Sequence, residues 1–198
     1  MKTKFRILGI DDSPFSRDEE FSLLIGVVMR ADFYIDGFIS ARIHIDGSDA
    51  EDKIVGMMSS RLASGCAVIM TSGITFGGFN MIDSQRLSDK TGKPFLSFTD
   101  RDPDIEGMRA AILKYFPGSE RLRILESSKT EALKLKNGAT CYVNRSKINI
   151  QDARSIINKT IREVSSFDYL VRADAAEKIS KLIGKPEKCP HGYPIKYG

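Results

Sequence analysis

The sequence predicts an α/β fold with a mixed sheet, in which antiparallel strands come first and parallel strands follow, with helices on both faces. Three strand-like segments near the start of the chain are joined by short connections, which is typical of an antiparallel meander. Farther along, short apolar segments alternate with stretches of helical spacing, which is typical of parallel βα units. With 198 residues and 41% hydrophobic side chains, the chain has enough apolar material for a single domain, residues 1–198.

The first expected strand lies in residues 5–15, F-R-I-L-G-I-D-D-S-P-F. Bulky residues alternate there and lead into two adjacent carboxylates before a Ser-Pro turn, so Asp11 and Asp12 should end a central strand. Open α/β sheets usually place their chemistry at this edge, which makes both aspartates candidate catalytic residues. The alternative for Asp12 is an Asx-type turn ahead of the proline.

Two further strands complete the meander. Residues 21–29, F-S-L-L-I-G-V-V-M, form a continuous apolar run that suits a buried strand. Residues 38–45 alternate instead, and one face of that strand would carry Ile39, Ala41, Ile43 and Ile45.

The parallel part begins with a helix that should run to about residue 63, with Ser48 or Asp49 as its N-cap. A short apolar strand is expected at residues 66–71, then a glycine-containing turn and a helix over about residues 79–91. A strand at residues 94–98 and a helix at residues 103–116 would complete a core of about residues 1–116.

Residues 117–198 are expected to form a C-terminal extension. Asn137 and Gly138 predict a type I′ hairpin turn within residues 133–144. Amphipathic helices are expected at residues 150–164 and 172–183, followed by an irregular tail.

Composition limits the environment of the chain. Three widely spaced cysteines make a disulfide framework unfavourable and indicate the reducing cytoplasm. The sequence contains no apolar run long enough to cross a bilayer, so no membrane partner is expected. The oligomeric state is not predicted.

Charge is distributed unevenly along the chain. Residues 1–100 carry a net charge of −3 and residues 101–198 carry +7. An acidic half beside a basic half suits a cation site next to a surface that binds the phosphates of DNA or RNA. The alternative is that the basic excess is solvated helix surface.

Residues 72–78, S-G-I-T-F-G-G, could bind an anion. Gly73, Gly77 and Gly78 would leave backbone N–H groups accessible before a helix, and Thr75 and Asn80 could add side-chain contacts to a phosphate. The alternative is a tight turn that only packs the chain. Neither a Walker A sequence nor a dinucleotide fingerprint is present.

Several motifs carry a resemblance to known families. The expected order of elements, with an aspartate ending the first strand, is similar to the ribonuclease H-like fold. Within that fold, Gly9–Asp11 resembles the G-V-D of endonuclease V, whose aspartate binds metal, and Gly37–Arg42 resembles its G-F-L-x-F-R. Residues 72–87 resemble the segment in which that family has V-D-G followed by a loop and a helix.

A closer resemblance is to the archaeal family called domain of unknown function 99. It shares G-I-D-D-x-P-F, D-G-x-D-A and G-I-x-x-x-G-F-N-x-x-D, which stand here at residues 9–15, 46–50 and 73–83. These motifs cover most of residues 5–116, and the chain is identified as a member on their strength.

The metal ligands of endonuclease V are only partly matched. Ile43 and Ser72 stand where that family has its glutamate and its second aspartate, so Asp11 alone remains in register. We expect a relocated Mg²⁺ or Mn²⁺ site in which Asp11 is joined by other aspartates near the same edge: Asp46, Asp49 and Asp83. The alternative is that Asp46 and Asp49 cap a helix and that Asp83 faces solvent or binds backbone.

The favoured function is that of an endonuclease V-like protein: a metal-dependent nuclease, or at least a nucleic-acid-binding protein. Two alternatives stay open. One is a non-catalytic nucleic-acid-binding module that kept the fold and lost the chemistry. The other is an enzyme that acts on a small phosphorylated molecule.

Overall fold

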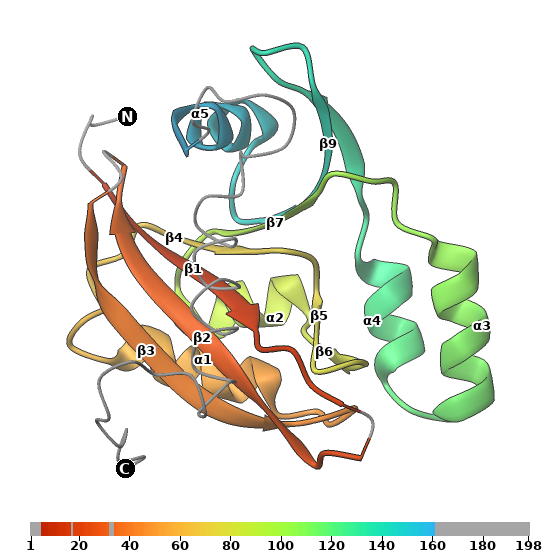
Figure 1. The fold of residues 1–198 in the computed structure, drawn as a ribbon. Coiled ribbons are helices and arrows are strands. Elements are labelled where there is room, and N and C mark those ends of the chain that lie inside the picture. Colours follow the sequence, from red (N-terminus) through yellow and green to blue (C-terminus); the bar gives the residue numbers. More distant parts are fainter. Residues whose placement is uncertain (1–4, 17, 32–33, 161–198) are drawn as a thin grey trace.

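The computed structural model describes residues 5–16, 18–31 and 34–160. Its centre is a seven-stranded sheet with the order β3-β2-β1-β4-β7-β9-β8 (Figure 1). The first three strands, β1 (Arg6–Asp12), β2 (Phe21–Arg30) and β3 (Ile35–His44), form an antiparallel meander, as the sequence predicts.

The sheet continues in parallel from β1. Strand β4 (Val68–Thr71) pairs with β1, and β7 (Phe95–Thr99) pairs with β4, both in parallel. The predicted hairpin then adds two antiparallel strands to the same sheet, β9 (Thr140–Ser146) on β7 and β8 (Glu131–Lys134) at the edge. Its turn is not the predicted type I′ turn, because Gly138 has a positive φ of 86° but Asn137 does not have a positive φ. The mixed sheet predicted from the sequence is therefore confirmed.

Helices cover both faces of the sheet. Helices α1 (Ala50–Ser59) and α2 (Ser84–Thr91) cover one face, where Ile54 and Leu87 pack against a core that includes Leu8 and Ile69. Helix α5 (Ile150–Thr160) covers the other face through Ile156 and Ile157 (Figure 1). The predicted alternation in β3 is also observed, since Ile43 is fully buried between two exposed neighbours.

Helices α3 (Ile105–Tyr115) and α4 (Arg121–Ser127) lie side by side beyond the edge of the parallel strands (Figure 1). They form a separate apolar cluster, in which Ile112, Ile124 and Leu125 pack with Met81. Helix α4 was not predicted. The two helices lie next to the strand ends and supply residues that line one side of the candidate site.

The prediction of a helix over residues 79–91 is wrong in its first part. Residues 75–81 form a small hairpin, β5 (Thr75–Phe76) and β6 (Asn80–Met81), and α2 begins only at Ser84. The hairpin turn is made by Gly77 and Gly78 at φ values of 49° and 84°, a region that favours glycine. Asp83 is the N-cap of α2, and its carboxylate accepts hydrogen bonds from two backbone N–H groups of the first turn.

Helix α1 is also shorter than predicted, because the chain becomes extended at Ser60. Part of the expected helix at 150–164, the whole helix at 172–183 and the tail lie outside the described residues. No helix in the described ranges is long and apolar enough to cross a membrane.

A buried ion pair joins α1 to α2. Glu51 is 4% exposed, and its carboxylate lies 2.7 Å from Nε of Arg86 and 3.0 Å from Nζ of Lys90. The same carboxylate accepts a hydrogen bond from the backbone N–H of Asp83. Because these contacts neutralise a charge that is buried against the core, they hold the two helices in register.

We expect Glu51→Ala to lower the free energy of unfolding by about 2–3 kcal/mol, since Arg86 and Lys90 would lose their buried partner. The expected loss is moderate because both cations are partly exposed and have second acidic partners. Urea denaturation measures the change. The matched control is Asp52→Ala on the same helix, which removes an exposed partner of Lys90 and should cost less than about 1 kcal/mol. Equal losses in the two variants would contradict the buried-pair interpretation.

Candidate functional site

The candidate site lies at the edge where the three parallel strands end. Ile10 of β1 pairs with Thr71 of β4, and Thr71 pairs with Ser97 of β7. Asp11 and Ser72 each follow one residue after the last of the β1–β4 pairs. This is the edge at which open α/β sheets usually bind ligands.

Asp11 and Asp12 are both half-buried at the end of β1, but they face opposite sides of the sheet, because successive side chains of a strand alternate. Oδ1 of Asp11 accepts a hydrogen bond of 3.0 Å from the backbone N–H of Asp12. Oδ2 of Asp12 accepts one of 2.7 Å from the backbone N–H of Gly77. Asp12 therefore holds the β5–β6 hairpin against β1.

Asp46 binds the same hairpin from the other side. Its backbone N–H donates to the carbonyl of Gly77 at 2.7 Å, and its carboxylate accepts from the backbone N–H of Phe79 at 2.7 Å. Gly78 lies so close that a Cβ atom there would be 2.3 Å from the Asp46 carboxylate. Arg121 of α4 adds hydrogen bonds to the carbonyls of Asp46, Gly47 and Phe79.

Asn80 is fully buried, and its side-chain amide makes hydrogen bonds to other parts of the protein. Its side-chain oxygen accepts from the N–H of Ala50 at 3.0 Å, which is the first residue of α1. Its amide nitrogen donates to the carbonyl of His44 and to the carboxylate of Asp49, at 2.9 and 2.7 Å. Asn80 therefore caps α1 from a distance, and the prediction that it contacts substrate is not supported by this geometry.

Asp49 occupies the N-cap position of α1, but its side chain makes no capping hydrogen bond. Its carboxylate instead accepts from Nδ1 of His44 at 3.0 Å and from Asn80. Burial opposes ionisation of Asp49, yet the hydrogen bonds from Asn80 and His44 prevail and hold its pKa below the usual range.

Asp83 contacts both α2 and α4. It caps α2 and lies 3.1 Å from Nη2 of Arg123, and it is 8% exposed. Burial raises the pKa of Asp83, but the hydrogen bonds from the Arg86 backbone and from Arg123 outweigh that effect, so the pKa is lowered overall.

The aspartates predicted to share a metal ion are thus held by different parts of the structure. Asp46 holds the hairpin turn, Asp49 binds His44 and Asn80, and Asp83 caps α2. In the described part of the chain, no three His, Cys, Asp or Glu side chains are grouped so that they could hold a metal ion. The predicted cluster is therefore not seen among the described residues, and a metal site that includes Asp11 stays a prediction.

The glycine loop also differs from the predicted anion site. The N–H of Gly77 is taken by Asp12, and the first-turn N–H groups of α2 are taken by Asp83. Gly78 is part of the turn that packs on Asp46. Gly73 and Thr75, in contrast, line a pocket beside the strand ends.

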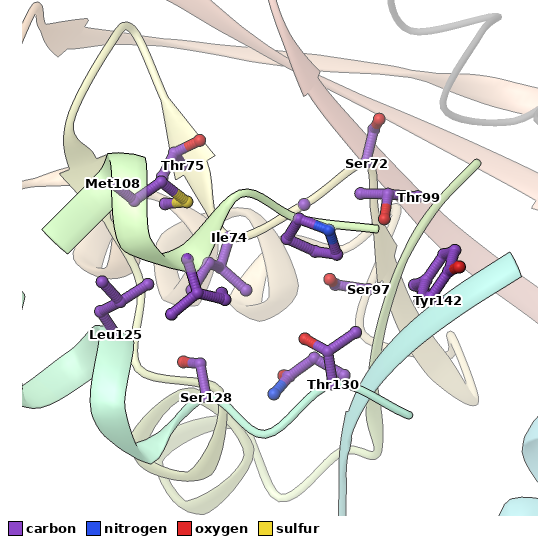
Figure 2. Close-up of a pocket in the computed structure, with 14 residues that line it drawn as sticks. Ser72, Ile74, Thr75, Ser97, Thr99, Met108, Leu125, Ser128, Thr130 and Tyr142 are labelled. Carbon is purple, nitrogen blue, oxygen red and sulfur yellow. The ribbon is translucent and has the colours of Figure 1, made fainter. Parts of the chain in front are cut away.

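This pocket encloses about 200 Å³ between the sheet, α3 and α4 (Figure 2). Ser97 and Thr99 of β7 and Tyr142 and Asn144 of β9 line it from the sheet side. The apolar residues on its walls are Ile74, Pro103, Ile105, Met108 and Leu125, and its remaining lining residues are Ser72, Gly73, Thr75, Ser128 and Thr130. The side-chain oxygens of Ser97 and Thr130 point into the space in Figure 2.

Asn144 is a pocket residue with an unpaired group. The residue is 6% exposed, and its Nδ2 donates a hydrogen bond of 3.0 Å to the carbonyl of Lys129, which fixes the orientation of the amide. Its Oδ1 is buried and has no hydrogen-bond partner among the described residues. An unpaired buried acceptor is rare in folded proteins and calls for an explanation.

The sequence analysis missed the sheet side of this pocket. One signal was available: Ser97 and Thr99 share one face of a strand whose other inward residues are apolar, F-L-S-F-T. Polar residues at alternate positions of a buried strand indicate a polar cavity, but no local pattern pairs them with Tyr142 and Asn144.

Comparisons with known proteins place the chain among archaeal nuclease-related sequences. The sequence profile of the endonuclease dU family matches residues 3–183. A UPF0215 protein of Thermoplasma volcanium is 38% identical over 162 residues, which are 81% of this chain and 82% of that protein. The profile carries the family name endonuclease dU and the relative carries the name UPF0215, so the name domain of unknown function 99 stays a prediction.

Solved structures agree with this placement. A protein of unknown function from Archaeoglobus fulgidus has a TM-score of 0.77 at 27% identity, with 90% of this chain and 98% of that chain covered. An endonuclease V variant of Ciona intestinalis, in complex with an inosine-containing DNA, has a TM-score of 0.58 at 11% identity, with 91% and 87% covered. The second likeness shows the fold, and the ribonuclease H-like, endonuclease V-like fold predicted from the sequence is confirmed.

We expect Asn80→Ala to lower the free energy of unfolding by about 2–3 kcal/mol, because the buried N–H of Ala50 and the Asp49 carboxylate would each lose a partner. Urea denaturation measures the loss. The matched control is Asn137→Ala in the exposed hairpin turn, where the expected loss is below about 1 kcal/mol. An Asn80→Ala protein of unchanged stability would restore Asn80 as a candidate ligand contact.

Asp83 should make stability dependent on pH. Because its pKa is lower in the folded state, its contribution is present above the unfolded value of about 3.9 and is lost as pH falls through the folded pKa. Asp83→Asn keeps an N-cap oxygen but removes the charge, so it should be less stable than wild type near pH 6 and should approach wild type near about pH 3. Urea denaturation across this range measures both curves, and parallel curves would refute the assignment.

Proposed function

The chain belongs to the endonuclease dU family, and we propose that it is a metal-dependent nuclease that cleaves DNA at or near deoxyuridine. The observation that carries this proposal is the match of the family profile to residues 3–183, nearly the whole chain. The endonuclease V fold supports it, because a solved relative of that fold holds DNA with a deaminated base, inosine.

Asp11 is the residue on which we place the chemistry. Its carboxylate lies at the end of a central strand, which is the position of the metal-binding aspartate in the endonuclease V motif. The other two positions of that motif do not supply ligands here, since Ile43 is fully buried in the core and Ser72 offers only a hydroxyl.

These donors fit one Mg²⁺ or Mn²⁺ ion better than two. Mg²⁺ is commonly held by one or two carboxylates together with water and the phosphates of the substrate, so Asp11 could hold an ion whose site is completed by DNA. When bound, the ion would supply an activated water and would stabilise charge on the phosphate. Asp11 would then hold that ion at the end of β1.

A second candidate is a nucleic-acid-binding protein without catalysis. The observation that favours it is the dispersal of Asp46, Asp49 and Asp83 into structural contacts. The basic excess of residues 101–198 suits phosphate binding in both cases, to DNA or to RNA. Because Cys66 and Cys141 are free and buried, we keep the reducing cytoplasm as the proposed compartment.

We expect Mn²⁺ to bind the wild-type protein more tightly in the presence of an uncleavable phosphorothioate DNA than alone, and Asp11→Asn to abolish that binding. Titration calorimetry measures the Mn²⁺ affinity. In a separate assay, the rate of cleavage of a deoxyuridine-containing duplex should fall at least about 100-fold in the variant, because the metal would lose its carboxylate. Asp89→Asn, on the exposed side of α2, is the matched control and should match wild type in both assays. Equal metal binding by wild type and Asp11→Asn would sink the assignment of Asp11, and DNA binding without any cleavage would favour the second candidate.

A further inference from the structure

The pocket between the sheet, α3 and α4 has the size of a single ring. It encloses about 200 Å³. Cavities of about 150 Å³ accept benzene, whereas pockets for drug-sized ligands begin at about 300 Å³. A six-membered ring with small substituents is therefore the class of ligand that fits this space.

The lining of the pocket favours a neutral, flat ligand with a polar edge. Among the described residues that line it, none carries a charge. A phosphate or a carboxylate would thus find no cation there, while Ile105, Met108 and Leu125 offer apolar contact to the face of a ring. Hydroxyl and amide groups on the sheet side can bind the edge of the ring.

The unpaired oxygen of Asn144 indicates that the polar edge of the ligand contains a hydrogen-bond donor. Its amide nitrogen is held by the carbonyl of Lys129, so the free group is the oxygen, a hydrogen-bond acceptor. A ligand N–H group would satisfy this oxygen and remove the free-energy cost of leaving it unpaired. Uracil carries an N–H at ring position 3, whereas cytosine carries a lone pair there, which an amide oxygen repels.

The pocket lies beside the ends of the parallel strands. Ser72 lines the pocket and directly follows Thr71, which pairs with Ile10, the residue before Asp11. A nucleotide whose base entered the pocket would therefore keep its phosphates near Asp11. Enzymes that recognise one altered base commonly take it out of the stack and bind it in such a pocket.

We propose that this pocket binds a single pyrimidine base with an N3–H group, extruded from a nucleic-acid strand, and that Asn144 accepts the N3 hydrogen. The inference rests on the proposed nuclease function for the identity of the natural ligand. It assigns discrimination against cytosine to Asn144 and the metal-dependent chemistry to Asp11, which are separate residues on separate strands; thymine also carries N3–H and is not excluded by this contact.

Binding of free nucleosides tests the pocket without any cleavage. We expect 2′-deoxyuridine, titrated at millimolar concentrations, to shift the NMR signals of residues around the pocket. N3-methyl-2′-deoxyuridine lacks the hydrogen, and 2′-deoxycytidine has a lone pair in its place, so both should bind at least about 10-fold more weakly. Equal binding of the three nucleosides, or no binding of 2′-deoxyuridine, would overturn the proposal.

Two variants test the pocket from independent directions. Asn144→Leu removes the acceptor, and Ser97→Leu fills the space from the sheet side. Each should weaken 2′-deoxyuridine binding at least about 10-fold, whereas Asn158→Leu on α5, on the opposite face of the sheet, should leave it unchanged. Thermal melting shows whether each variant is folded, and the comparison of nucleosides on wild type decides the matter if Asn144→Leu is not.

A cleavage assay on duplexes with one deoxyuridine, thymidine or deoxycytidine separates the two proposals. If wild type cleaves the deoxyuridine duplex and Asn144→Leu cleaves it with unchanged preference over deoxycytidine, the pocket proposal fails and the nuclease proposal stands. If wild type cleaves none of the duplexes but nucleoside binding follows the expected order, the nuclease proposal fails and the pocket stands as a base-binding site.

Discussion

The hydrogen bonds from aspartate carboxylates to the backbone of the β5–β6 hairpin organise the whole end of the sheet. Asp12 holds the N–H of Gly77, Asp46 holds the N–H of Phe79, and Asn80 extends the same network to the start of α1. Hydrogen bonds to ionised groups are roughly twice as strong as neutral ones, so this hairpin is firmly attached. Its position in turn allows α3 and α4 to pack against Met81 and to close the pocket.

This arrangement explains why the described residues show no grouped cluster of Asp46, Asp49 and Asp83. A carboxylate that already accepts hydrogen bonds from backbone N–H groups, as Asp46 and Asp83 do, would lose them on binding an ion. The acidic surface near the strand ends is therefore largely structural.

The two proposals assign metal binding and base binding to two neighbouring regions of the site. Asp11 would hold a metal ion next to a phosphate, and the uncharged pocket that begins at Ser72 would hold a base. Such a division lets specificity and catalysis be altered independently.

The sequence by itself determined the mixed sheet, the order of β1 to β4 and β7 within it, and the hairpin at β8–β9, because periodicity and turn residues are local signals that report burial directly. It also carried the resemblance to the endonuclease V fold. Only the tertiary structure decided which N–H groups Asp12, Asp46 and Asn80 bind, and which strands and helices enclose the pocket around Asn144. Those contacts join residues about 30 to 70 positions apart, and a side chain's partner at that distance depends on packing that no local pattern encodes.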